Sequence, residues 1–160
     1  MKIAFDEHLP PSIAAALKAF EGDDSLLRCD IVSARDYALP KAKSDVPWLE
    51  KFASDGGHVV VSGDVKMRGK LHEQRALSKA GFIVIFLSRR WGQANGYDKL
   101  SMLIRWWPRI LERIRHARPG QFFEVPYGWQ GSELIEVTPP EVPRKKPGRK
   151  PRGAVKATAA

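Results

Sequence analysis

The sequence predicts an α/β protein whose helices cover both faces of a mainly parallel sheet, a three-layer α/β/α sandwich, followed by a disordered basic tail. Short apolar runs alternate with stretches of helical periodicity, which is the pattern of β-α-β units. The 160 residues are about the length of one domain, and we assign residues 1–138 to it. From Pro139 onward the apolar content falls and Pro, Lys and Arg dominate, so residues 139–160 are predicted to be a disordered tail.

Short runs of apolar residues predict the strands of this sheet. Residues 58–62 give the clearest one, because a continuous β-branched run is expected of a central parallel strand that is covered on both faces. Two shorter runs around a Gly-rich turn predict an edge hairpin. The predicted strands cover residues 3–5, 29–32, 58–62, 82–87, 122–125 and 133–137.

The helices between these strands are predicted from their start signals and apolar spacing. Pro10 and Pro11 suit a helix start, where the missing N–H of proline costs nothing. Ser44 can cap the next helix, which places Asp45 in its first turn. The other predicted helices cover residues 71–80 and 97–116, and the last of these has one apolar stripe.

Composition favours a soluble protein of a reducing compartment. Cys29 is the only cysteine, so a disulfide within the chain is impossible. We find no signal segment, and no apolar run approaches the roughly 18 residues of a membrane span. The expectation is therefore a cytoplasmic protein with no membrane contact.

The net charge of +9 is concentrated in the tail, where seven basic residues face one acid. The stretch from Pro143 to Gly153 resembles an AT-hook, whose arginine lies in the minor groove of A·T-rich DNA. Lys150 interrupts the usual Gly-Arg-Pro core of that motif, which leaves nonspecific contact with RNA or DNA, or a solubilising role, as alternatives. The residues predicted to make nucleic-acid contacts here are Arg144, Lys145, Lys146, Arg149, Lys150 and Arg152.

Three acids are predicted to converge at one edge of the sheet. Asp6 and Asp64 each follow a predicted strand, and Asp45 starts a helix. In a parallel sheet the carboxyl ends of the strands share an edge with the amino ends of the following helices. Carboxylates gathered there repel one another unless a hard cation neutralises them, so Asp6, Asp45 and Asp64 are predicted ligands of Mg²⁺ or Mn²⁺. Glu73 is a candidate fourth catalytic acid.

Such a site would suit a metal-dependent nuclease. A bound divalent ion can orient a phosphodiester and lower the pKa of an attacking water. Lys66, Arg68 and Lys70 follow Asp64 directly and are candidate contacts for the phosphates of a bound strand.

Each acid also has a purely structural interpretation. Asp45 can cap a helix or interact with its dipole, and Asp64 can be a turn residue after Gly63. Glu73 can simply pair with Lys70 or with Arg75 on an exposed helix.

The opening stretch Phe5-Asp6-Glu7-His8-Leu9-Pro10 resembles the Asp-Glu-(Asn/His)-Leu-Pro start of small PIN-like proteins related to the VapC-type toxins. The stretches 59–64, 72–77 and 82–87 resemble later parts of the same family, so the similarity covers roughly residues 1–92.

This resemblance implies a PIN-like α/β/α fold and a ribonuclease that depends on Mg²⁺ or Mn²⁺. It also implies a toxin role in which a protein antitoxin neutralises the enzyme. By position, Asp6 and Asp64 match the metal-binding acids of the family and Asp45 matches its mid-chain acid. Glu73 stands where PIN domains more often have Asp.

Two other functions stay open on the sequence alone. A receiver domain also places acids after its first and a later strand, but Ser88-Arg89-Arg90 stands where its lysine is expected. A noncatalytic DNA-binding protein acting through the tail is the second alternative. The RNA target, the number of metals and the oligomeric state are likewise open.

Overall fold

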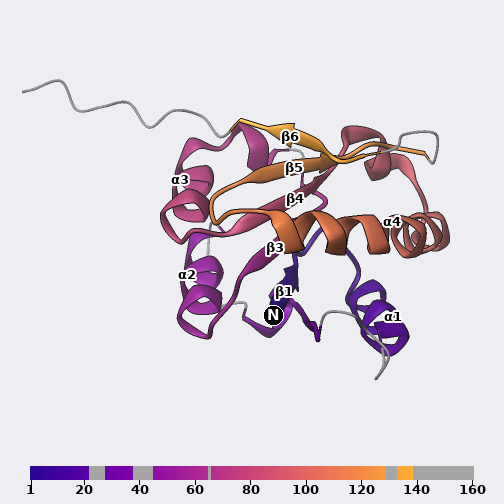
Figure 1. The fold of residues 1–160 in the computed structure, drawn as a ribbon, viewed down its shortest axis with the longest axis horizontal. Helices are drawn as coiled ribbons and strands as arrows, with labels where there is room; N and C mark the ends of the chain where they lie inside the picture. Colours follow the sequence, from indigo (N-terminus) through magenta and orange to yellow (C-terminus); the bar gives the residue numbers. More distant parts are fainter. Residues whose placement is uncertain (22–27, 38–44, 65, 129–132, 139–160) are drawn as a thin grey trace, which may run out of the picture.

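The computed structural model describes residues 1–21, 28–37, 45–64, 66–128 and 133–138. In this part of the chain, six strands form one sheet in the order β2-β1-β3-β4-β5-β6 (Figure 1). The first five are parallel to their neighbours, and β6 runs antiparallel to β5. The strands are β1 (Lys2–Phe5), β2 (Asp30–Ser33), β3 (Val59–Ser62), β4 (Ile83–Leu87), β5 (Phe122–Val125) and β6 (Ile135–Val137).

Two pairs of helices cover the sheet and complete the three layers. Residues of α1 (Pro11–Glu21) and α4 (Gly96–His116) share one buried cluster, while α2 (Val46–Ser54) and α3 (Leu71–Lys79) share the other. Figure 1 shows α4 in front of the sheet and α2 and α3 along the opposite layer. The predicted α/β/α sandwich with a mainly parallel sheet is confirmed. Short 3-10 turns are η1 (Ala34–Asp36), η2 (Met67–Gly69) and η3 (Arg89–Gln93).

Alternate residues of the central strands belong to the two clusters, which explains their continuous apolar sequence. In β3, Val59 and Val61 pack with α1 and α4, while Val60 packs with α2 and α3. All three are fully buried. A strand covered on both faces cannot alternate apolar and polar residues, because either face would then bury polar side chains.

The observed elements differ only slightly from the predicted ones. The second strand begins at Asp30 rather than Cys29, and the edge strand begins at Ile135 rather than Glu133. Asp45 takes the N-cap position of α2, so it lies one residue before the helix and not in its first turn. The predicted cap Ser44 and the predicted tail 139–160 lie outside the described residues.

Four tryptophans of the described part of the chain are buried: Trp48 lies in one cluster, and Trp91, Trp106 and Trp107 lie in the other. Trp91 and Trp106 are at most 1% exposed, and Trp107 packs in the same cluster. The indole N–H of Trp106 donates to the carbonyl oxygen of Gly128 over 3.0 Å. These side chains therefore serve the core. No helix among the described residues is long and apolar enough to cross a membrane.

The strand order places a topological switch point between β1 and β3. From β1 the chain first adds β2 on one side and then crosses to add β3 on the other. In open α/β sheets, ligands bind in the crevice outside the carboxyl ends of the strands that flank such a point. Asp6 and Asp64 follow these two strands.

Candidate functional site

Asp6 connects the carboxyl ends of β1 and β3 through its side chain, which is buried; the whole residue is only 2% exposed. Its Oδ1 accepts hydrogen bonds from the backbone N–H groups of His8, over 3.1 Å, and Gly63, over 3.2 Å. Its Oδ2 accepts from the Ser62 hydroxyl and, over 3.3 Å, from the backbone N–H of Asp64. The carboxylate thus fixes the turn after β1 against the turn after β3.

Burial raises the pKa of Asp6 above its ordinary value of 3.8. The hydrogen bonds from Ser62 and Gly63 and the nearby His8 ring act in the opposite direction without cancelling this effect. A cation placed beside Asp6 would lower this pKa, because it stabilises the ionised carboxylate.

Asp64 is the second buried acid of this edge, with 5% of its surface exposed. Its Oδ1 accepts a 2.7 Å hydrogen bond from the backbone N–H of Lys66. This bond agrees with the interpretation of Asp64 as a turn residue. Its Oδ2 lies 3.8 Å from the Lys70 ammonium. One oxygen therefore shapes the turn, and the other faces a cation.

Glu73 lies in the first turn of α3 and is 1% exposed, so it is not on an exposed helix face. Its Oε1 is 3.1 Å from the Lys70 ammonium and 3.6 Å from Nε2 of His72. Its Oε2 is buried and has no hydrogen-bond partner among the described residues. The predicted pairing with Lys70 is present, in a buried setting.

Asp45 hydrogen-bonds a residue of the helix that it caps, and among the described residues it has no direct bond to Asp6, Asp64 or Glu73. Its Oδ1 accepts a 3.2 Å hydrogen bond from the indole N–H of Trp48, and the residue is half-buried. The carboxylates of Glu73, Asp64 and Asp45, in that order of effect, all raise the pKa of Lys70. Lys70 is thus the group on which the fields of these three acids converge.

The donors at this edge are chemically suited to a hard divalent cation. Asp6, Asp64 and Glu73 offer carboxylate oxygens, the ligands that Mg²⁺ and Mn²⁺ prefer. The unpartnered Oε2 of Glu73 and the ammonium already beside Asp64 both indicate a place that favours positive charge. Within the described ranges, however, no three His, Cys, Asp or Glu side chains are gathered closely enough to hold a metal ion. Metal binding would require these side chains to draw together.

The basic residues predicted to contact phosphates have different surroundings. Lys66 is exposed. Arg68 forms an ion pair with Glu124 on β5, and its guanidinium lies 5.9 Å from the centre of the Phe86 ring. Lys70 is engaged by acids, and the predicted tail residues lie outside the described part of the chain.

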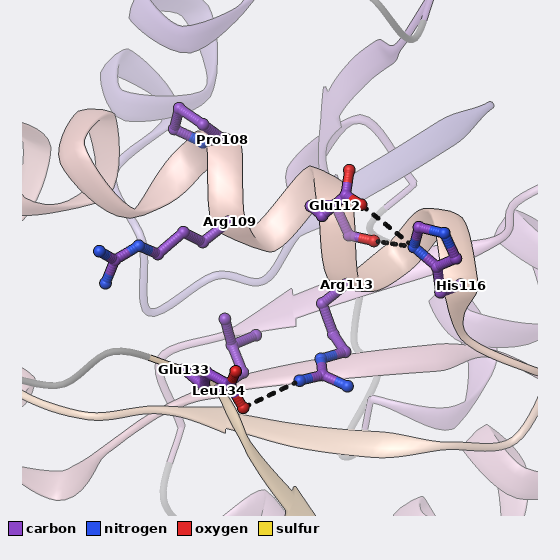
Figure 2. Close-up of a pocket in the computed structure, with 7 residues that line it drawn as sticks. All are labelled: Pro108, Arg109, Glu112, Arg113, His116, Glu133 and Leu134. Carbon is purple, nitrogen blue, oxygen red and sulfur yellow. Dashed lines mark hydrogen bonds and ion pairs between the residues drawn. The ribbon is translucent and has the colours of Figure 1, made fainter.

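A pocket of about 460 Å³ lies elsewhere, between α4 and the start of β6 (Figure 2). Within it Arg113 pairs with Glu133 over 3.7 Å, and His116 lies 3.4 Å from Glu112. Figure 2 shows both pairs among the residues that line the pocket. The nuclease interpretation uses none of these residues. The lining residues are Pro108, Arg109, Glu112, Arg113, His116, Glu133 and Leu134.

Sequence reasoning missed Ser62 and the role of His8. Ser62 is fully buried at the end of β3, and its hydroxyl donates to Asp6. A hydroxyl residue that ends the strand beside a strand-end acid is the signal that could have indicated this bond. The backbone N–H of His8 holds the same carboxylate, a role that its residue type does not reveal.

Comparison with known families matches residues 1–89 to the family described as PIN like domain. This range contains Asp6, Asp45, Asp64 and Glu73. No curated protein and no solved structure gives a significant match. PIN domains are generally nucleases, which are hydrolases. The matched range is more than half of the 160 residues, so the chain belongs to the PIN-like domain family.

Proposed function

We propose that this protein is a ribonuclease that depends on Mg²⁺ or Mn²⁺ and hydrolyses phosphodiester bonds of RNA. The observation that supports it most strongly is the pair of buried acids Asp6 and Asp64 at the switch point of the sheet. A PIN-like chain that buries two carboxylates at neighbouring strand ends, where ligands bind, has the main chemical requirement of a metal-dependent nuclease.

Asp6, Asp64 and Glu73 would hold the metal, and Asp45 is the remaining candidate ligand. The bound ion would supply Lewis-acid chemistry, activating water and offsetting the charge that develops on the phosphate. Asp6 positions Asp64 by accepting a hydrogen bond from its backbone N–H. Ser62 and Gly63 fix the orientation of Asp6 itself, so the Asp6 side chain and the Asp64 backbone are held before substrate arrives.

Substrate would approach over the exposed rim of this edge. Lys66 is exposed two residues after Asp64, and there its charge can attract the phosphates of an RNA strand. We assign Arg68 and Lys70 supporting roles in that contact, because both side chains are already paired with acids. The basic tail would add nonspecific attraction to RNA or DNA.

A toxin role, with a protein antitoxin as partner, is the biological setting that the PIN-like resemblance favours. Expression of the wild-type chain should then arrest growth, whereas expression of Asp64→Asn should not. A small protein encoded next to this gene should relieve the arrest. Growth arrest by both forms would contradict the proposed toxin activity.

The enzymatic proposal is tested with purified full-length protein and a labelled single-stranded RNA. Cleavage should require Mg²⁺ or Mn²⁺ and stop when EDTA is added. Asp64→Asn and Asp6→Asn should each lower the rate at least about a hundredfold, since each removes a charged ligand. Glu7→Gln is the matched control, because Glu7 is the exposed acid next to Asp6 and should be dispensable. Equal cleavage by wild type and Asp64→Asn would overturn the proposal.

A further inference from the structure

Lys70 occupies the link between η2 and α3, and its backbone is fixed on both sides. Its N–H donates to the carbonyl oxygen of Met67, and its own carbonyl oxygen accepts from the N–H of Gln74. From this position its ammonium reaches Glu73 over 3.1 Å and Asp64 over 3.8 Å. The side chain therefore bridges the first turn of α3 and the turn after β3.

The two acids that it bridges are much less exposed than Lys70 itself. The Glu73 side chain is 1% exposed and the Asp64 side chain 5%, whereas the Lys70 side chain is 41% exposed. A buried carboxylate is costly without a counterion. Lys70 pairs with both acids. The more exposed ring of His72 is a second partner of Glu73.

We propose that Lys70 is an internal cation that occupies the place between Asp64 and Glu73 in the metal-free protein and competes with a divalent ion for them. This inference rests on the proposed metal-dependent function. A divalent ion contacts carboxylate oxygen at roughly 2.1 Å. The Lys70 ammonium, at 3.1 Å from Glu73, would lie too close to such an ion, and the two positive charges would repel each other.

Lys70 can yield this place without disturbing the fold. Its ammonium is carried on a flexible four-carbon chain, and its side chain is already partly exposed to solvent. After it moves outward, the charge stays at the rim of the site, beside the path proposed for RNA phosphates. Lys70 thus keeps the acids in place without metal and lowers the affinity of the site for metal.

The test measures Mn²⁺ binding by the electron paramagnetic resonance signal of free Mn²⁺, with full-length wild type, Lys70→Gln and Lys66→Gln. Lys70→Gln should bind Mn²⁺ about tenfold more tightly than wild type. Lys66→Gln removes the same charge from the same loop, yet its side chain is not the one that bridges the acids, so its affinity should stay within about twofold of wild type. Lys70→Arg should restore the weak wild-type affinity.

Thermal unfolding provides a second readout. Without metal, Lys70→Gln should have a lower Tm than wild type, because Asp64 and Glu73 lose their shared counterion. Saturating Mn²⁺ should raise the Tm of Lys70→Gln more than that of wild type. In a Glu73→Gln background, Lys70→Gln should no longer tighten binding.

The outcomes separate this inference from the proposed function. If wild type binds Mn²⁺ and Lys70→Gln binds it equally or more weakly, Lys70 does not compete and only the inference fails. If both lysine variants tighten binding equally, the effect is general electrostatics and the inference also fails. If neither wild type nor Lys70→Gln binds Mn²⁺, the metal site itself is wrong.

Discussion

The backbone N–H of Asp64 donates to the carboxylate of Asp6 over 3.3 Å, although 58 residues separate the two in sequence. The same carboxylate accepts from Ser62, Gly63 and His8, so donors from both strand ends hold it in place. Asp6 therefore has a structural role as well as a proposed catalytic one.

This structural role predicts different stabilities for two substitutions of Asp6. Asp6→Ala should lower the free energy of unfolding by about 3 kcal/mol, because buried donors lose their acceptor. Asp6→Asn should cost only about 1 kcal/mol, since the Ser62 hydroxyl can turn to accept from the new amide. Urea unfolding at neutral pH measures both. Equal losses for the two variants would show that the hydroxyl does not adjust.

A second prediction concerns the amino ends of the strands, opposite the proposed site. There Asp55 is 2.6 Å from the Lys2 ammonium and accepts a hydrogen bond from the Tyr37 hydroxyl. Hydrogen bonds from Lys2 and Tyr37 lower the pKa of Asp55 below its ordinary 3.8. A carboxyl group whose pKa is lowered in the folded state stabilises the fold at pH values above its unfolded-state pKa. This contribution is lost as the pH falls through its folded-state pKa.

Asp55→Asn should therefore destabilise the protein at neutral pH, and the difference from wild type should shrink as the pH falls through the lowered folded-state pKa, below which the carboxyl group is protonated in both states. Urea midpoints across this range measure it, with RNA cleavage at neutral pH as a check that the site is unaffected. A pH-independent difference would mean that the Asp55 charge is not responsible.

The tail supplies a third prediction. Deleting residues 139–160 removes seven basic residues and one acid. Cleavage should survive, while the slope of log affinity for single-stranded RNA against log salt should decrease by roughly 0.7 for each phosphate that the tail had neutralised. Fluorescence anisotropy of Asp64→Asn with and without the deletion measures this slope. An unchanged slope would support a solubilising role. A full-length chain that cleaves no RNA, and whose DNA binding is lost with the tail, would favour the noncatalytic DNA-binding alternative.

Sequence periodicity predicted the sheet well because burial on both faces leaves a direct signature. The Val59–Ser62 strand reads as one apolar run for that reason. The same parallel geometry predicted that Asp6 and Asp64 share an edge. Helix α4 was predicted over residues 97–116 and covers Gly96–His116, because the apolar stripe that predicts it packs in one buried cluster.

Details of the site depend on side-chain directions, which the sequence does not show. Lys70 was predicted as a phosphate contact, yet its ammonium faces Glu73 and Asp64. Asp45 hydrogen-bonds Trp48 three residues later, a local partner that competes with the predicted convergence. The receiver alternative is superseded, because the chain belongs to the PIN-like family.

The proposed metal centre is formed by the acids at the β1 and β3 ends. Paramagnetic broadening by substoichiometric Mn²⁺ in an amide NMR spectrum of the full chain is its most direct test, because broadening locates the ion independently of activity. We expect selective loss of the His8, Gly63 and Asp64 signals, and no such loss in Asp64→Asn. Selective loss at Glu112 and His116, in the pocket of Figure 2, with the Asp64 signal intact would contradict this assignment.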